Sequence, residues 1–338
     1  MNTKNSRPEW LKQLKDFEAP SRLRAIRQIV NSAVPYAAIV VLMYLTIQWG
    51  WPVWATILLA VPAAAFLVRM FIIFHDCGHG SFFKSQKANR IVGTVMGVLT
   101  FTSFGNWRYG HGIHHSSSGN LDRRTIGEVW TLTVDEYKAS PWYRRVAYRV
   151  YRNPFVMFGL APLLLFVVSQ RFPDKHSGKK QVRSVWITNG FIAAIVLAAT
   201  FTIGIGPYLL IQMSIMYFAG MAGIWLFYVQ HQFDPGYWER AEEWDFVDAA
   251  IEGSSYYKLP KILQWFTGNI GLHHVHHLRP RIPNYNLQRC LDSIPELQVK
   301  DHLTIRESFR SIWMNLWDEA NSRLISFRQL DRRRAAAA

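Results

Sequence analysis

Four long apolar runs dominate the pattern of hydrophobic and polar positions along the chain. They cover residues 33–47, 53–74, 185–203 and 207–229, and only a short turn separates the two members of each pair. About 20 apolar residues cross a bilayer as a helix, and such runs joined in pairs by short turns are typical of transmembrane hairpins. The pattern therefore predicts an all-α integral membrane protein with four transmembrane helices in two hairpins.

Two shorter apolar runs, residues 91–104 and 155–168, have fourteen residues each. This length is short for a span and favours interfacial or re-entrant helices. The first 28 residues are charged and show no hydrophobic stretch of the kind found in a cleavable signal peptide. We divide the chain into a basic N-terminal segment (1–28), a membrane domain (29–300) and a C-terminal helix and tail (301–338).

Ten of the twelve histidines lie in three clusters or at the isolated His231. The clusters read HDCGH at 75–79, HGIHH at 111–115 and HHVHH at 273–277. The spacings i, i+4 and i, i+3, i+4 place the histidines of each cluster on one face of a helix, apart from His274, which points off that face. Imidazole is the commonest protein ligand for transition metals, and eight such nitrogens are too many for one ion. The clusters therefore predict two metal ions held close together.

The remaining histidines are interpreted one by one. His231 stands alone at the end of an apolar run and is a further candidate ligand. We expect His274 to lie behind the ligands or to face solvent. His176 and His302 are expected to be ordinary polar residues.

The order of spans and clusters makes a topological prediction. If all clusters meet at one site, an even number of spans must separate them, and four spans satisfy this condition. The same side then receives most of the basic residues, whereas the two opposite turns carry no charge. Because Lys and Arg accumulate on the cytoplasmic side, we expect a helical cap with the metal site in the cytoplasm, at a bacterial inner membrane. The net charge of +15 fits this bias and favours contact with anionic lipid headgroups. Nucleic-acid binding is disfavoured, because the basic residues are scattered and no recognition module is present.

Carboxylates near the clusters are candidates for orienting the histidines. Asp76 lies inside the first cluster and could hold the second nitrogen of a histidine in the correct tautomer. Asp122 and Glu128 follow the second cluster and could do the same. For these two the competing interpretation is a surface pair with Arg123 and Arg124.

The clusters, in this order, resemble the histidine boxes of the membrane fatty acid desaturase family. The likeness extends to segments 75–83 (HDCGHGSFF), 119–137 (GNLDRRTIGEVWTLTVDEY) and 268–287 (GNIGLHHVHHLRPRIPNYNL). These segments are similar to bacterial and plant acyl-lipid desaturases, including the Δ12-type and the bacterial Δ5-type enzymes. The resemblance covers roughly residues 30–300.

The resemblance implies a non-haem enzyme with two iron ions that uses O2 and two electrons to place a cis double bond in the acyl chain of a membrane phospholipid or glycolipid. The electrons would come from an external donor, expected to be a ferredoxin. No catalytic residue is implied beyond the metal ligands; His231 matches an additional histidine of the family, and His274 matches none. The implied ligands are His75, His79, His111, His114, His115, His231, His273, His276 and His277.

Three alternatives remain at the level of sequence. A sister enzyme that hydroxylates or epoxidises acyl chains shares the same scaffold and ligands. A metal transporter or sensor would carry its histidines within the spans, whereas here they lie just beyond them. A membrane zinc hydrolase would need fewer ligands and a Glu between paired histidines, which the clusters lack.

Overall fold

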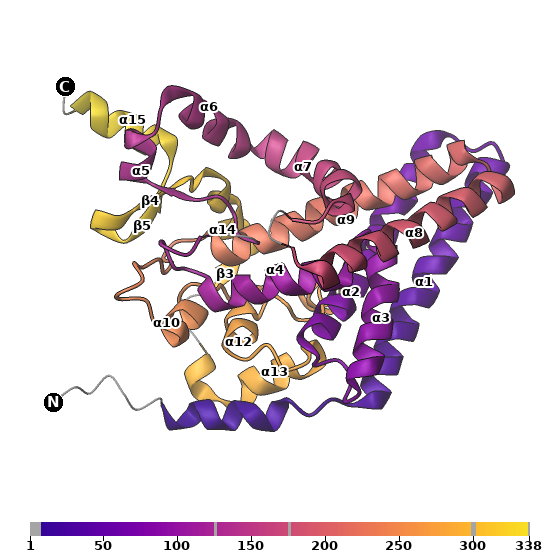
Figure 1. Ribbon diagram of the computed structural model, residues 1–338, viewed down its shortest axis with the longest axis horizontal. Helices are drawn as coiled ribbons and strands as arrows, with labels where there is room; N and C mark the ends of the chain where they lie inside the picture. The colour runs from indigo at the N-terminus through magenta and orange to yellow at the C-terminus, as the bar shows by residue number, and fades with distance from the viewer. Residues whose placement is uncertain (1–7, 125–126, 175–176, 299–301, 337–338) are drawn as a thin grey trace.

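Four long helices form two hairpins in the computed structural model, which describes residues 8–124, 127–174, 177–298 and 302–336. The first hairpin pairs α1 (Arg22–Gln48) with α2 (Val53–His79), and the second pairs α8 (Lys179–Thr202) with α9 (Ile205–His231). All four are long and apolar enough to cross a membrane, and α2 packs between α1 and α9. The predicted class is confirmed: a mainly helical multi-pass membrane protein, with the hairpins gathered on one side of the molecule (Figure 1).

The spans are longer than the apolar runs that predicted them. A helix of 27 residues is about 40 Å long, whereas the hydrocarbon core of a bilayer is about 30 Å thick. α2 and α9 therefore continue past the apolar core, and their final turns carry His75, His79 and His231. α2 stops at Gly80, whose left-handed φ of 71° lets its N–H bond the carbonyls of Asp76 and Cys77.

The two short apolar runs form shorter helical segments. α3 (Gln86–Leu99) starts at Ser85, whose hydroxyl accepts the N–H of Ala88. The second run becomes η3 (Phe155–Leu160), α7 (Ala161–Leu163), η4 (Leu164–Val168) and η5 (Ser169–Arg171), which bend by 57° from α6 (Trp142–Tyr151). By length and composition this pair is a broken fifth span or a re-entrant loop. A fifth crossing would put α4 (Phe104–Ser117) and the end of α9 on opposite membrane sides, yet His114 and His231 meet, so we interpret the pair as re-entrant.

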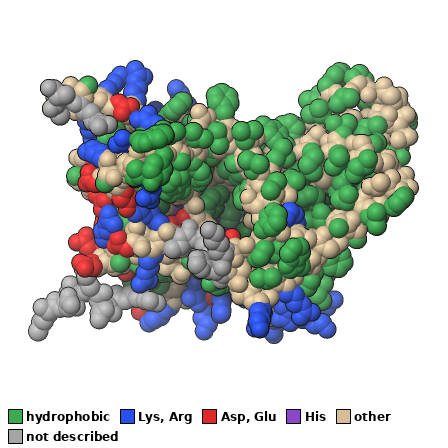
Figure 2. All heavy atoms as spheres, turned by 45° about the horizontal axis from the view of Figure 1, so that its top comes forward, with side chains coloured by type: hydrophobic (Ala, Val, Ile, Leu, Met, Phe, Trp, Pro, Cys, Tyr) green, Lys and Arg blue, Asp and Glu red, His purple; other side chains and the backbone are tan. Residues whose placement is uncertain are grey.

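A cap of short elements covers one end of the hairpins. We define it as the described parts of residues 9–17, 104–151 and 232–336. Its helices include α5 (Val134–Ala139), α10 (Phe246–Ile251), α11 (Lys261–Phe266), α12 (His273–Leu278) and α13 (Asn284–Ser293). Figure 2 shows charged side chains gathered over the cap side and along the lower edge, while the hairpins on the right are mostly hydrophobic.

The cap also contains short strands that the sequence did not predict. β1 (Leu132–Thr133) pairs in parallel with β4 (Leu316–Asp318), which pairs antiparallel with β5 (Arg323–Ile325). β2 (Tyr257–Lys258) pairs in parallel with β3 (Leu303–Thr304). Strands of two or three residues are too short to show a period of two, which explains why the pattern did not reveal them.

The two chain ends differ in detail from the expected segments. The N-terminal segment forms η2 (Glu9–Phe17), a 3-10 helix that buries Leu14 against the region of α13, and α1 already begins within it. The C-terminal segment does end in a helix, α15 (Phe327–Ala336). Before α15, however, come β3, α14 (Ile305–Ser308), η7 (Phe309–Trp313), β4, η8 (Glu319–Asn321) and β5.

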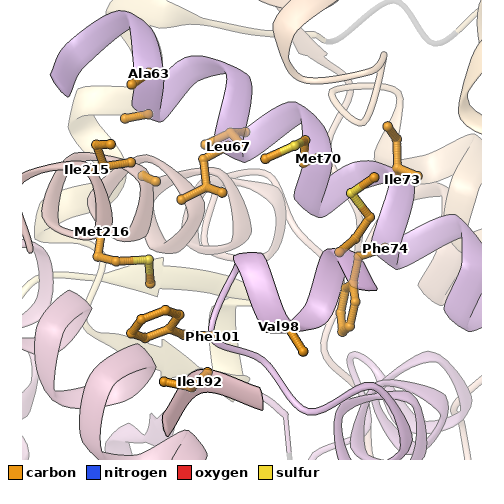
Figure 3. Close-up of a cluster of buried hydrophobic side chains, with 14 of the residues drawn as sticks. Ala63, Leu67, Met70, Ile73, Phe74, Val98, Phe101, Ile192, Ile215 and Met216 are labelled. Carbon is orange, nitrogen blue, oxygen red and sulfur yellow. The ribbon is translucent and has the colours of Figure 1, made fainter. Parts of the chain in front are cut away.

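The main hydrophobic core lies where α2, α3, α8 and α9 meet. Leu67 of α2 lies near Ile215 and Met216 of α9 in this core, and further along α2 Phe74 lies beside Val98 of α3 (Figure 3). The core joins the last turns of α2 to its neighbours, so the histidines at the end of α2 rest on a well-packed base.

Gly97 of α3 is a position where this core should tolerate no side chain. A Cβ added there would lie 2.5 Å from the carbonyl oxygen of Thr102 and 3.0 Å from the Phe74 ring. We expect Gly97→Ala to lower the free energy of unfolding by about 1–3 kcal/mol, the usual cost of overpacking. Thermal unfolding of the purified protein in detergent would measure this, with Gly190→Ala as control because its Cβ meets nothing within 4 Å. Equal transition temperatures for both variants would contradict the prediction.

Candidate metal centre

Nine histidines converge in two groups at the junction of the hairpins and the cap. Within each group, one ring nitrogen of every histidine lies within 4.8 Å of those of the others. Group one consists of His75, His79, His111, His115 and His276, and group two consists of His114, His231, His273 and His277. The structure therefore brings together every histidine that the sequence proposed as a ligand, the isolated His231 included.

Four helices supply the histidines, and two of these helices serve both groups. α2 contributes only to group one and α9 only to group two. α4 supplies His111 and His115 to group one and His114 to group two. α12 supplies His276 to group one and His273 and His277 to group two. The i, i+3, i+4 spacing thus places one helix face across two adjacent groups, as two neighbouring ions would require.

The nitrogen atoms face one another at short range. In group one the Nε2 atom of His111 is 3.1 Å from that of His79, and the Nε2 atom of His115 is 3.1 Å from those of His111 and His276. In group two the Nε2 atom of His231 is 3.1 Å from that of His114 and 3.0 Å from that of His273. Two imidazoles bound at right angles to one ion, each at about 2.1 Å, would be about 3 Å apart. These separations fit metal coordination.

Electrostatics keep the cap histidines neutral. Burial lowers the pKa of each histidine on α4 and α12 that belongs to a group well below its ordinary value, and neighbouring histidines lower it further. A neutral imidazole offers a lone pair, which is the form that binds a metal ion. Both groups therefore suit a cation, and no carboxylate belongs to either among the described residues.

Asp76 lies behind group one, in the place expected of an orienting carboxylate. Its Oδ1 atom is 3.1 Å from Nδ1 of His75, and both residues are buried. Its Oδ2 atom accepts the backbone N–H of Asn284 at 2.6 Å and the Asn284 amide at 2.8 Å. Asp76 therefore ties the end of α2 to the start of α13, directly beyond the third histidine cluster.

The other two candidate carboxylates occupy different environments. Asp122 accepts a hydrogen bond from Arg240 at 2.7 Å and another from the N–H of Ala241 at 2.9 Å, so it contacts these residues instead of a histidine. Its surface ion pair is with Arg240, not with the arginines suggested by sequence proximity. The side chain of Glu128 is buried, with Oε1 4.0 Å from Nδ1 of His114, and this burial raises the pKa of Glu128 to about 8.

His274 belongs to neither group. It is fully buried, and its Nε2–H donates to the carbonyl of Leu297 at 3.0 Å. The expectation that it faces solvent is wrong, because α12 is covered on all sides and the off-face position points into the cap core. His302 lies against the ring of Tyr256 and joins neither group, and His176 lies outside the described residues.

Three residues outside the predicted set of ligands and orienting carboxylates support the site. Trp107 stacks on His111 with ring centroids 4.2 Å apart, and its position one helical turn before His111 could have indicated this. Gln230 donates to the carbonyl of Ile270 at 2.9 Å and so fixes the approach to α12. Asn284 contacts Asp76 from 208 residues away, a separation for which the sequence gives no signal.

The buried His274 predicts a measurable pH dependence of stability. Burial lowers its pKa to about 4, whereas an unfolded histidine titrates near 6.5. The unfolded chain therefore takes up a proton first as pH falls, and His274 should cost about 2 kcal/mol of stability between pH 6.5 and pH 5. Thermal unfolding of the iron-free protein at both pH values should show a smaller loss for His274→Gln, which keeps a donor for Leu297. Equal losses in both proteins would contradict this.

The two adjacent groups of histidines indicate that this multi-pass helical membrane protein is built around a metal centre. The family model "Fatty acid desaturase" matches residues 49–309, and the chain belongs to this family. It is therefore an oxidoreductase, and the resemblance in the sequence is confirmed. Family membership favours this class over the metal transporter and the zinc hydrolase.

Individual relatives agree with the family assignment. A fatty acid desaturase of Bacillus subtilis is 44% identical over 319 residues, which cover 94% of this chain and 90% of that protein. An sn-1 oleoyl-lipid 12-desaturase of Synechocystis sp. is 27% identical, covering 78% of this chain and 72% of that protein. An sn-1 acyl-lipid omega-3 desaturase (ferredoxin) of Synechocystis sp. is 26% identical, covering 72% and 70%.

Proposed function

We propose that the chain is an oxygen-dependent acyl-lipid desaturase that introduces a cis double bond into a fatty acyl chain of a membrane phospholipid or glycolipid. The observation that carries this proposal is the convergence of nine histidines in two groups at the end of the membrane hairpins. Removing two hydrogens from an unactivated alkyl chain needs a strong oxidant, which iron and O2 supply when bound. The chain's own residues must bind the metal, orient the acyl chain and exclude water.

We assign one iron ion to each histidine group. Group one offers five nitrogen donors and group two offers four, and all nine come from imidazoles. Asp76 would accept the Nδ1–H of His75 and leave its Nε2 lone pair free for the ion. Seven of the nine side chains are buried, while His79 and His111 are half-buried, so the groups are largely shielded from solvent.

The position of the groups supports a lipid substrate. The last turns of α2 and α9, just past the apolar core, carry histidines, so an acyl chain lying beside the hairpins would extend only a short way beyond this core to reach the site. One relative is named for an oleoyl-lipid substrate, which is consistent with an acyl chain still attached to its lipid.

The membrane side and the electron donor follow from charge. We propose that the cap faces the cytoplasm across a bacterial inner membrane, because the turns at the other end of the hairpins contain no charged residue. We further propose a ferredoxin as the external electron donor, because the name of one relative, the omega-3 desaturase of Synechocystis sp., includes ferredoxin. The basic residues at the cap end of the hairpins suit an acidic carrier and predict that turnover falls as salt rises. These basic residues, which lie between the hairpins or in the first turns of α8, include Lys84, Lys87, Arg90, Arg108, Arg144, Arg145, Lys179, Lys180 and Arg183.

The first experiment is a fatty acid profile by mass spectrometry, with the double-bond position mapped. A bacterium expressing the intact chain would be compared with one expressing His111→Ala and one expressing His302→Ala. A new unsaturated species should appear with the intact chain and with His302→Ala, whose histidine lies outside both groups, and should be absent with His111→Ala. A hydroxylated product instead would contradict desaturation and indicate the sister activity.

A further inference from the structure

Behind group two lies a buried carboxylate without a partner. The Glu128 side chain is 6% exposed, and neither of its oxygens has a hydrogen-bond partner among the described residues. Nδ1 of His114 is also buried and unpartnered there, and it lies 4.0 Å from Oε1 of Glu128. This distance is too long for a hydrogen bond, but a shift of about 1 Å would close it.

The free-energy cost of leaving the Glu128 oxygens unpaired indicates that a hydrogen-bond donor should reach them. A buried polar atom without a hydrogen bond costs about 1–3 kcal/mol, and more when it carries a charge. Arg124, the cation whose field reaches Glu128, forms its own ion pair with Glu136. A cation bound to Nε2 of His114 would strengthen the Nδ1–H of the same ring as a donor, and that donor points to the Glu128 carboxylate.

Group one shows the same arrangement in its completed form. There the Asp76 carboxylate lies 3.1 Å from Nδ1 of His75, and Asn284 holds its other oxygen. Each group thus has one carboxylate behind one histidine. The two differ in that Asp76 is fixed from both sides, whereas Glu128 has no such anchor among the described residues.

Space around Glu128 allows the required shift. On one side it borders a small cavity of about 10 Å³ that it shares with His114, Ser118 and His231. On the other side it forms part of the wall of a cleft of about 640 Å³, together with Arg124, Trp130, Glu136 and Arg144. The carboxylate is therefore buried against the histidines yet not confined by tight packing.

We propose that Glu128 is the positioning residue of group two: its carboxylate accepts the Nδ1–H of His114 and holds that ring with Nε2 toward His231. This inference rests on the proposed function, since it assumes that group two binds a metal ion. Removal of such a hydrogen-bond partner typically weakens metal binding by about 10–100-fold. The effect should fall on one of the two ions, because Asp76 serves the other group.

The test compares Glu128→Leu, which has similar volume but no acceptor, with Glu128→Gln, which keeps one acceptor oxygen. Asp122→Asn is the control, because Asp122 lines the same cleft but bonds Arg240. The full-length proteins would be freed of metal in detergent and titrated anaerobically with ferrous iron. Iron per chain and the 57Fe Mössbauer spectrum would be recorded, and the unfolding temperature of the iron-free proteins measured.

We expect Glu128→Leu to bind one of its two irons about 10–100-fold more weakly, with one altered Mössbauer component. Glu128→Gln should recover part of this loss, and Asp122→Asn should match the unchanged protein. The iron-free Glu128→Leu protein should be at least as stable as the unchanged protein, because it lacks a buried carboxyl group without a hydrogen-bond partner.

Two results would overturn the inference. One is Glu128→Leu binding both irons with unchanged affinity; the other is a loss of both irons together with a lower stability of the iron-free protein, which would give Glu128 a purely structural role. If the unchanged protein itself bound no pair of irons, the proposed function would fail instead, so the two failures are distinguishable.

Discussion

His276→Ala is expected to abolish desaturation, whereas His274→Gln should retain most of it. The two histidines stand two positions apart on α12, and both are buried. His276 directs Nε2 at His115 within group one, while His274 binds the carbonyl of Leu297 in the cap core. Since a lost partner of a ligand already costs about 10–100-fold, loss of a ligand should lower the rate by at least about 100-fold.

The comparison separates a metal role from general damage to α12. Product formation would be followed by mass spectrometry at pH 7.5, above the range in which His274 affects stability. Iron per chain would be determined on the same preparations, and we expect it to fall only in His276→Ala. Equal activity and iron content in the two variants would contradict the assignment of His276 to the metal centre.

The sequence predicted the spans and the histidines because both depend on local patterns. A long apolar run directly indicates a helix that crosses the bilayer, and a spacing of three or four residues indicates that two side chains share one face of a helix. It did not predict how His111 and His114 divide between the groups, since both lie on the same side of α4. That division depends on where α2 and α9 end in space. The residue spacing within a single helix carries no information about the positions of other helices.

The carboxylates show the same limit. Asp122 and Glu128 follow His115 by seven and thirteen residues, and no local pattern distinguishes their roles. In the structure Asp122 pairs with Arg240, whereas Glu128 lies beside His114. The choice between the two expected positions of His274, behind the ligands or facing solvent, was left open for a similar reason, because its partner Leu297 is 23 residues away in a part of the cap with no periodic pattern.

Asp76→Ala is expected to weaken both the fold and group one. The change removes the acceptor of Nδ1 of His75 and of two N–H donors of Asn284, all of them buried. Leaving a buried donor without its acceptor costs about 1–3 kcal/mol, and three such donors should appear as a clearly lower unfolding temperature of the iron-free protein. Asp292→Ala is the control, since Asp292 lies exposed on α13 and accepts a side-chain hydrogen bond from Gln288 of the same helix.

The iron content gives this prediction a second, independent readout. Asp76→Ala should lose affinity for the iron of group one, while the ion of group two, which Asp76 does not contact, stays bound. Glu128→Leu should show the reverse preference, so the two variants together should alter different Mössbauer components. The prediction would be contradicted if Asp76→Ala unfolded at the same temperature as Asp292→Ala and held both irons. Asp76 would then support neither the third cluster nor His75, and its link between α2 and α13 would not contribute to stability.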